Sequence, residues 1–360
     1  MPAGEEIGYN VALVGASSLK GKELKDLLQE RHFPVDRLML LDAEEVGGQL
    51  TDFDNEPAVI HPVNKESFED IDFAFFASSP AFTRDHWQMA ADNHCEIIDL
   101  SYFLEVNPQA KLLAPLVESL WTNQPPTAPA AAPESSRISV SAHPVAIAIA
   151  GVMARLSSRF TIQRSAITVY EPVSEQGQAG VEELHRQTLS LLSFQKIPRR
   201  VFNSQVAFNL LTSYGEDASP SLRAVQLRIH SHLRSLLGAR AQQPALRVLQ
   251  APVFYGHAFS CFLEIAESVP AAEIDEVLDR KPLDVYRDSD SPPTVAAVAG
   301  SDEIILGPIE RDQGSESGYW LWGTLDNLRL AAHNAIQIAE DLISAGAGRQ
   351  GRNAALGSEE

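Results

Sequence analysis

Cysteine is scarce in this sequence, with only Cys95 and Cys261 among 360 residues. The two lie far apart and form neither a CxxC pair nor the Cys/His spacing of a zinc site. We therefore expect no disulfide framework and no bound metal, and reduced cysteines favour a cytoplasmic location.

Basic residues are fewer than acidic ones. The sequence has 28 lysines and arginines and 48 aspartates and glutamates, which gives a net charge of -20. That balance argues against a nucleic-acid partner.

Long hydrophobic runs are missing too. The longest, residues 145–154, is about half of the ~20 residues that a membrane-spanning helix needs. The opening residues, MPAGEEIG, are acidic rather than basic, so we expect neither an export signal nor a membrane partner. What is present is a globular composition, 44% apolar, in a chain long enough for two domains of roughly 100–200 residues each.

Strand-like and helix-like segments alternate in the first part of the chain. YNVALVGASSLKGKELKDLLQER combines an apolar strand, a turn of small residues and an amphipathic helix. RLMLLDA, DFAFFASSP and CEIIDLS continue as strands, with a helix at AFTRDHWQMAADNH. The alternation predicts the α/β class, with an open and mostly parallel sheet. The stretch TNQPPTAPAAAPESSR, residues 122–137, predicts an exposed loop or insertion.

The second part combines longer strands with amphipathic helices. Strand-like FTIQRSAITVYEPVS, ALRVLQAPVFYG and AFSCFLEIAES accompany helices at VEELHRQTLSLLSF and LRAVQLRIHSHLRSLLG. This pattern predicts an α+β domain over residues 141–322, followed by a helix over 324–344. The remaining residues, 345–360, predict a flexible tail.

The first candidate site is the turn Gly15-Ala16-Ser17-Ser18-Leu19. Glycines at such a turn let a dinucleotide pyrophosphate approach the N–H groups of the following helix. Only the first and last small positions, Gly15 and Gly21, are glycine, and Ser18 adds a side chain at the tightest point. The turn alone leaves nucleotide binding open.

A second helix begins without a polar residue, in SAHPVAIAIAGVMARL, residues 141–156. A helix N-terminus favours anions and lowers the pKa of a thiol placed there. The first turn here offers only Val145, Ala146, Ile147 and Ala148. The commonest explanation is a helix that is buried from its start.

Together these segments resemble the aspartate-semialdehyde dehydrogenase family over about residues 8–344. The resemblance is carried by VGASSLKGKEL, VYEPVSEQGQAGVEEL, FNLL, APVFYGHAFSCFLEI and WGTLDNLRLAAHNAIQIAEDLI. It implies a Rossmann-type domain, residues 1–140, completed by the helix 324–344, a substrate and dimerisation domain, residues 141–322, and a homodimer. Within the family, the chain is most similar to the bacterial USG-1-like paralogues, which lack the catalytic cysteine.

The resemblance also implies a reaction and its residues. The family makes aspartate semialdehyde by NADPH-dependent reduction of aspartyl phosphate through a covalent thioester. Its Asn-Pro-Asn-Cys motif aligns with His143-Pro144-Val145-Ala146, and the alanine has no nucleophilic atom. The general base of its Gly-His motif is kept as His257, which is the remaining catalytic residue that the resemblance implies.

Substrate positions differ as well. The family's Tyr-Gln-x-Val-Ser-Gly aligns with residues 170–175, so its substrate-positioning glutamine is Glu171 here. A substrate-binding arginine seven residues before the histidine is Gln250, and a phosphate-binding arginine is Leu104. These changes remove positive charge from a site for an anionic substrate.

Cofactor binding is expected to be weakened, with NAD and NADP both open and no metal. The segment that would hold the 2′-phosphate of NADP is replaced by LLDAEEVGG, although Asp42 or Glu44 could bond the ribose of NAD. Family glycines near the nicotinamide correspond to Ser79-Pro80. The candidate cofactor residues are Gly15, Ala16, Ser17, Ser18, Leu19 and Ser79.

Three hypotheses follow. The first is a dimeric binding or regulatory protein without the family's activity. The second is an NAD(P)-dependent oxidoreductase that transfers hydride to a small acid or aldehyde without a thioester, using His257 or His143 as acid–base group. The third is a protein that binds a small acidic ligand in the former substrate cleft.

Overall fold

A computed structural model describes residues 8–54, 56–121, 136–287 and 293–346. Most of the predicted loop 122–137 and of the predicted tail 345–360 lies outside these ranges. The chain divides into two compact units. The first comprises Met1–Pro115, Ala130–Ala142 and Ala331–Glu360, and the second comprises Leu116–Pro129 and His143–Leu330. Within the described residues, no helix is long and apolar enough to cross a membrane.

The first unit is built on an eight-stranded sheet in the order β3-β4-β2-β1-β5-β6-β8-β7. Its strands are β1 (Tyr9–Val14), β2 (Val35–Asp42), β3 (Leu50–Phe53), β4 (Glu56–Pro62), β5 (Phe73–Phe76), β6 (Glu96–Asp99), β7 (Lys111–Leu113) and β8 (Ile138–Ser141). The β3–β4 pair is antiparallel and the other pairs are parallel. The expected mostly parallel α/β sheet is thereby confirmed.

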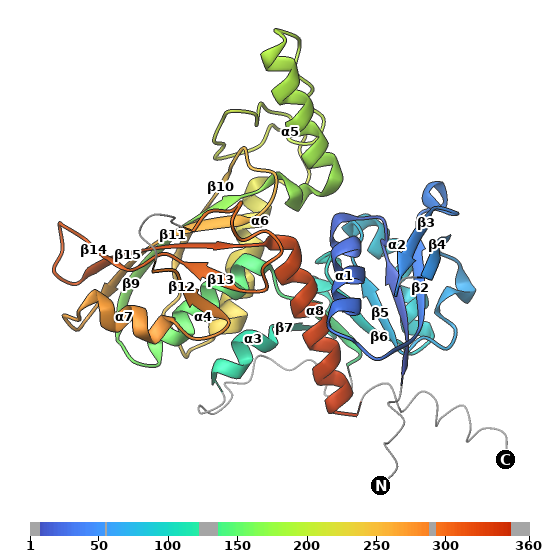
Figure 1. The fold of residues 1–360 in the computed structure, drawn as a ribbon, viewed down its shortest axis with the longest axis horizontal. Helices are drawn as coiled ribbons and strands as arrows, with labels where there is room; N and C mark the ends of the chain where they lie inside the picture. The colour runs from blue at the N-terminus through green and yellow to red at the C-terminus, as the bar shows by residue number, and fades with distance from the viewer. Residues whose placement is uncertain (1–7, 55, 122–135, 288–292, 347–360) are drawn as a thin grey trace. The chain divides into compact units, whose positions relative to one another are not determined.

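Helices cover both faces of this sheet (Figure 1). The helices α1 (Leu19–Glu30) and α8 (Asn327–Ser344) share one apolar core through residues such as Leu24 and Ile336. The helix α2 (Pro80–Asp92) covers the other face, where Ala90 packs with Phe76. Shorter helical turns connect the strands: η1 (Glu44–Val46), η2 (Lys65–Phe68), η3 (Phe103–Val106), α3 (Pro115–Glu118) and η4 (Ser119–Trp121).

The second unit contains a mixed seven-stranded sheet in the order β10-β9-β11-β15-β13-β12, with β14 paired to β15. The strands are β9 (Ile162–Glu171), β10 (Ala245–Gln250), β11 (His257–Ile265), β12 (Leu283–Val285), β13 (Ile304–Leu306), β14 (Glu310–Arg311) and β15 (Gly318–Leu325). Strand β10 runs parallel to β9, whereas β11 runs antiparallel to both β9 and β15. The carboxyl ends of β9 and β10 therefore meet the beginning of β11.

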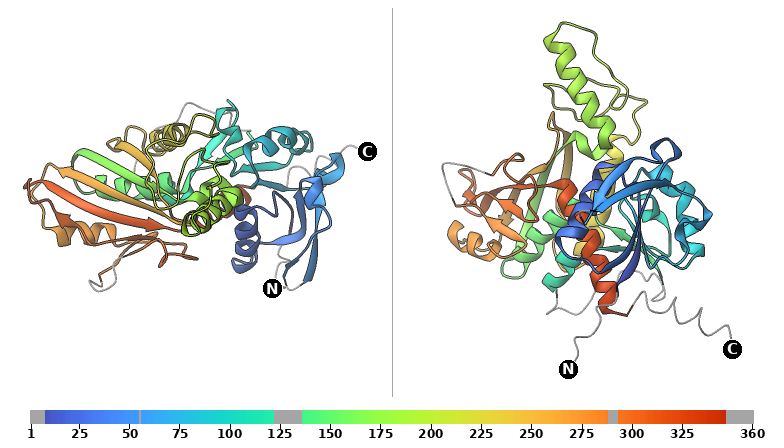
Figure 2. Two further views of the ribbon diagram at one scale, coloured as in Figure 1. Left: turned by 90° about the horizontal axis from the view of Figure 1, so that it is seen from above. Right: turned by 45° about the vertical axis from the view of Figure 1, so that its right-hand side comes forward.

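The helix α4 (Pro144–Ser157) is the central helix of this unit. It contacts α6 (Leu222–Leu237), α7 (Ala271–Leu278) and β9, and its residues from Pro144 to Ala154 are all buried. Burial on every side explains why its sequence is apolar from the first turn. After η5 (Val173–Gln176), the helix α5 (Gly177–Leu192) stands out from the sheet, as Figures 1 and 2 show.

Candidate functional site

The site predicted at the start of α4 holds a buried alanine. Ala146 has an exposed fraction of 0%, and its N–H donates to the carbonyl of His143, 2.8 Å away. His143 is the N-cap residue and Pro144 occupies the first helical turn. The polar group at this helix N-terminus is therefore the imidazole of His143, whose side chain is 2% exposed.

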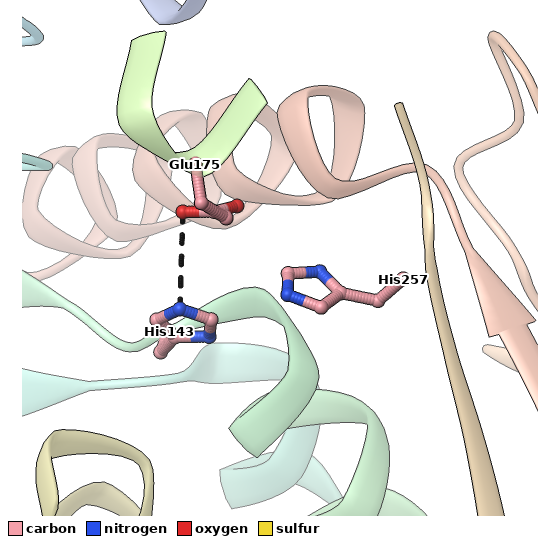
Figure 3. A group of neighbouring side chains, drawn as sticks. All are labelled: His143, Glu175 and His257. Atoms are coloured by element: carbon pink, nitrogen blue, oxygen red, sulfur yellow. Dashed lines mark ion pairs between the residues drawn. The ribbon is translucent and has the colours of Figure 1, made fainter. Parts of the chain in front are cut away.

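His143 faces a carboxylate and a second histidine. Its Nε2 lies 3.8 Å from Oε2 of Glu175, which belongs to η5, and the Glu175 side chain is 5% exposed. The ring of His257 lies beside it, with ring centroids 5.4 Å apart and ring planes at 67°. Figure 3 shows these three side chains, which come from three separate elements, turned toward one shared region. The structure thus brings the predicted His257 together with His143, the N-cap residue of the helix whose first turn holds Ala146.

Glu171, Gln250 and His257 lie together at the ends of neighbouring strands. Gln250 pairs with Glu171 across β10 and β9. Ala258 pairs with Tyr170, so His257, one residue earlier on β11, lies opposite Glu171. The His257 Nε2 and Glu171 Oε2 atoms are 3.4 Å apart, and neither side chain is exposed. Three predicted site residues therefore form one buried group.

Glu171 is a buried carboxylate in a mixed electrostatic environment. Burial raises its pKa most strongly, and the negative charge of Glu175 raises it further. The hydrogen bond and charge of His257, together with the charge of Arg228, act to lower the same pKa. Its Oε1 atom is buried and has no hydrogen-bond partner among the described residues. This carboxylate is only partly satisfied by the protein around it.

Gln250, in contrast, is fully engaged inside the protein. Its Nε2 donates to the carbonyls of Glu171 and Ala251 at 2.8 and 2.9 Å. Its Oε1 accepts a 2.6 Å hydrogen bond from the hydroxyl of Tyr214. Burial and the charge of Glu171 raise the pKa of that hydroxyl, so it stays protonated and continues to donate. The Gln250 side chain is therefore committed to structure.

Several residues of this group were missed in the sequence. Asn327, at the start of α8, donates from Nδ2 to Oε1 of Glu175 at 2.7 Å. Its Oδ1 accepts from the N–H of Gly256 at 2.9 Å, which ties the residue before His257 to the same asparagine. His232 Nδ1 accepts from the His143 N–H at 3.0 Å. Of these residues, only His232 had a signal in the local sequence. It lies one helical turn after Arg228 in α6, so the two side chains share one face of that helix.

Neither cysteine can replace the missing thiol. Cys95 lies in the apolar core of the first unit and is 1% exposed. Cys261 lies on β11 and is 0% exposed. Burial raises the pKa of each thiol to about 12, so neither is a thiolate near neutral pH.

The candidate cofactor turn in the first unit has the backbone geometry of a tight strand-to-helix connection. Gly15 has φ +88°, and a Cβ there would lie 2.6 Å from Ser78 atoms. A Cβ on Gly21 would lie 2.1 Å from the Gly15 carbonyl oxygen. Neither position has room for a Cβ atom, because backbone atoms of neighbouring segments approach both glycines closely.

The serines of this turn bond to the protein. Ser18 Oγ caps α1 by accepting from the Gly21 N–H at 2.9 Å, and it donates to the Ala77 carbonyl at 2.8 Å. Ser17 donates its N–H to Oδ2 of Asp42, and the N–H of Ala43 bonds to the other oxygen of that carboxylate, both at 2.8 Å.

The remaining cofactor candidates lie close by. Ala16 is buried, Leu19 is half-buried, and Ser79 is an exposed N-cap of α2. The turn after β1 and the residues after β5 are thus adjacent, as expected for neighbouring parallel strands. Leu104, in contrast, is buried in the core of the first unit.

A separate apolar groove of about 770 Å³ lies on the other face of the second sheet. The exposed side chains of Trp320 and Trp322 line it, at alternate positions of β15. Tyr170, Ala258 and Ser260 contribute from β9 and β11. None of the buried histidines and glutamates described above lines this groove.

Comparison with known proteins gives a consistent assignment for both units. Residues 10–124 match the family model described as "Semialdehyde dehydrogenase, NAD binding domain", and residues 153–330 match "Semialdehyde dehydrogenase, dimerisation domain". A USG-1 protein homolog of Pseudomonas aeruginosa is 35% identical, over 93% of this chain and 97% of that protein.

Solved structures agree with this assignment. A probable aspartate-semialdehyde dehydrogenase from Pseudomonas aeruginosa has a TM-score of 0.81 and 32% identity, covering 94% of this chain and 99% of that one. Aspartate semialdehyde dehydrogenase II of Vibrio cholerae, solved in complex with ASA, has a TM-score of 0.82 and 25% identity with the same coverage. The chain belongs to the semialdehyde dehydrogenase family.

Proposed function

We propose that this chain is an aspartate-semialdehyde dehydrogenase-like protein that does not catalyse the family's NADP-dependent phosphorylating reaction. It acts instead as a homodimeric binding or regulatory protein, with a small acidic molecule as a candidate ligand. The observation that carries the proposal is Ala146 in the first turn of α4, three residues after His143, whose ring lies 5.4 Å from that of the retained His257. A thioester cannot form on a methyl group, whatever surrounds it.

The neighbouring residues support the same conclusion. His257 is paired with Glu171, and Gln250 is held by Tyr214 and two backbone carbonyls. Both are thus engaged by the protein, and Cys95 and Cys261 are protonated, buried thiols. Restoring the family reaction would require more than one substitution. The two buried cysteines, neither of them in a disulfide, also support a cytoplasmic location.

Dimerisation is supported by the groove on the outer face of the second sheet. Trp320 and Trp322 are 43% and 38% exposed there, within the segment that matches the dimerisation-domain model. Large exposed aromatic side chains in a concave apolar surface are typical of protein interfaces. We propose that a second copy of the chain covers them.

Residual nucleotide binding forms part of the proposal. Gly15 and Gly21 preserve the close approach that a dinucleotide-binding turn needs. Asp42, however, already accepts two backbone N–H groups, so its carboxylate is less available for a ribose hydroxyl. We therefore expect NAD or NADP to bind weakly, with a dissociation constant in the millimolar range. This weak binding does not change the proposal that the chain lacks the family reaction.

The central experiment is a direct assay of the family reaction. Purified full-length protein is incubated with aspartate semialdehyde, phosphate and NADP⁺, and the absorbance of NADPH is followed. Aspartate semialdehyde dehydrogenase II of Vibrio cholerae, assayed in parallel, is the positive control. We expect no signal above the protein-free rate, and turnover comparable with the control would contradict the proposal.

A second candidate function is an oxidoreductase that transfers hydride without a covalent intermediate. The pairs His257–Glu171 and His143–Glu175 favour it, because each places an imidazole beside a buried carboxylate that can orient it, and histidine is the commonest acid–base catalyst. This function needs a bound nicotinamide. Calorimetry with NAD⁺ and NADP⁺ at millimolar concentration tests this second function, since complete absence of binding eliminates the oxidoreductase.

A further inference from the structure

Four side chains of types that can bind a metal ion lie around one small buried region of the second unit. One ligand atom from each of His143, Glu175 and His257 lies within 4.8 Å of the other two. Glu171 Oε2 lies 3.4 Å from Nε2 of the same His257. The four side chains are at most 5% exposed, so the region is screened from solvent.

We propose that His143, Glu175 and His257, with Glu171 as a further oxygen ligand, bind one divalent transition-metal ion of the zinc type. Imidazole nitrogen and carboxylate oxygen are common ligands of Zn²⁺. The proposal is independent of the proposed function, because it concerns metal affinity and not turnover.

The distances fit metal ligation as well as ion pairing. Charge-assisted hydrogen bonds between nitrogen and oxygen span about 2.7–2.9 Å. The His143–Glu175 and His257–Glu171 separations are longer, 3.8 and 3.4 Å. With zinc–ligand bonds of about 2.0–2.2 Å, two ligands of a tetrahedral ion lie about 3.3–3.6 Å apart. The ligand atoms of His143, Glu175 and His257 lie within 4.8 Å of one another, so an inward movement of the side chains would complete a metal shell.

The charges support it as well. Two carboxylates in a buried site are costly unless cations balance them. Arg228 already contributes one positive charge toward Glu171. One divalent ion would add two more and would leave both imidazoles neutral, as metal ligation requires. It would also supply a partner for Glu171 Oε1, which has none among the described residues.

Outer contacts already hold the ligands in place. Asn327 donates to the Glu175 carboxylate at 2.7 Å, and His232 accepts from the backbone N–H of His143 at 3.0 Å. Hydrogen bonds of this kind orient the ligands of protein metal sites. Three of the four ligands also stand where the aligned family motifs have other residues: Asn at 143, Gln at 171 and Gly at 175. The loss of the thiol thus coincides with a gain of ligands at the same place.

The test is metal binding by the purified full-length chain. After dialysis against a chelator and removal of the chelator, Zn²⁺ is titrated by calorimetry and Co²⁺ by visible absorption. We expect one ion per chain, and a Co²⁺ spectrum with the intense bands of a tetrahedral site. The variants His143→Asn and Glu175→Gly introduce the residues of the aligned motifs, and each is expected to weaken Zn²⁺ binding at least tenfold.

His185→Asn is the matched control, because His185 is exposed on α5 and lies outside the group. It should leave Zn²⁺ affinity unchanged, and near-ultraviolet circular dichroism verifies the fold of each variant. The proposal is overturned if the unmodified chain takes up no Zn²⁺, or if folded His143→Asn and Glu175→Gly bind it as tightly as the unmodified chain does. Should a variant fail to fold, the Co²⁺ spectrum decides: weak octahedral bands overturn the proposal and tetrahedral bands support it.

Discussion

The hydroxyl of Tyr214 donates a 2.6 Å hydrogen bond to Oε1 of Gln250, a residue with no exposed surface. The resemblance predicts that Gln250 stands at the position of a substrate-binding arginine. Here its side chain ties the end of β10 to the β9 backbone and to the segment that precedes α6. The Gln250 side chain is therefore part of the protein's internal hydrogen bonding.

Removing this hydroxyl should be costly. Tyr214→Phe leaves Oε1 of Gln250 buried without a donor, so we expect a loss of about 1–3 kcal/mol in the free energy of unfolding. Urea denaturation measures it. Tyr255→Phe is the control, because Tyr255 is 41% exposed and its hydroxyl removal should change stability little. Equal effects of the two substitutions would show that the Tyr214 bond contributes nothing specific.

The two native thiols should be unreactive in the folded protein. Because burial raises the pKa of Cys95 and Cys261 to about 12, both remain protonated at pH 8 and are also inaccessible. Their contribution to stability is complete below the ordinary thiol pKa of about 8.5, and it is lost as pH rises through the raised value. Iodoacetamide labelling followed by mass spectrometry should modify neither cysteine at pH 8 and both in urea. Rapid labelling of either one in the native state would refute the burial.

Restoring the cysteine alone should not restore the family reaction. In Ala146→Cys the thiol would enter a fully buried helix turn, where added volume costs about 1–3 kcal/mol. Gln250 and Glu171, which the resemblance aligns with substrate-binding positions, would still lack the positive charge that an anionic substrate needs. We expect no phosphate-dependent NADPH formation, with the melting temperature lowered by a few degrees. Measurable turnover would mean that Ala146 is the sole block.

The fold was largely predictable because its signals are local. The alternation of apolar strands and amphipathic helices fixed the class of the first unit, and the apolar start of α4 correctly indicated burial. Trp320 and Trp322 are two residues apart on β15. This spacing is typical of a strand that presents both side chains on one face. Each of these features depends on residues close together in the sequence.

The histidine and glutamate group was not predictable in the same way. Its members come from the N-cap of α4, from η5, from the end of β9 and from the beginning of β11. Strand register pairs Glu171 with His257, and the tertiary fold brings His143 and Glu175 to them. Cysteine spacing, on which the expectation of no metal rested, says nothing about ligands scattered over separate elements. Glu175 was visible only as a departure from an aligned motif, and Asn327 gave no signal.

The groove on the second sheet should control assembly. Trp322→Glu places a charge in the proposed apolar interface, and tryptophans at interface centres contribute about 2 kcal/mol or more. We expect the dissociation constant of the dimer to rise at least tenfold, measured by light scattering over a dilution series. Phe194→Glu is the control, because Phe194 is 99% exposed and does not line the groove. A dimer that resists Trp322→Glu uses another face.

The cofactor turn provides a matched pair of glycines. Gly15 and Gly48 both have positive φ, +88° and +84°, so alanine at either position carries similar backbone strain, about 1 kcal/mol. Only at Gly15 would the new Cβ also overlap Ser78, at 2.6 Å, whereas nothing lies within 4 Å at Gly48. Gly15→Ala should therefore destabilise the protein by about 1–3 kcal/mol more than Gly48→Ala does in urea denaturation.

Gly15→Ala should also abolish any NAD or NADP binding, since the overlap forces apart the turn after β1 and the residues after β5. If both alanine variants lose equal stability, the close approach at Gly15 is not what holds the turn, and the case for a retained nucleotide site loses its main support.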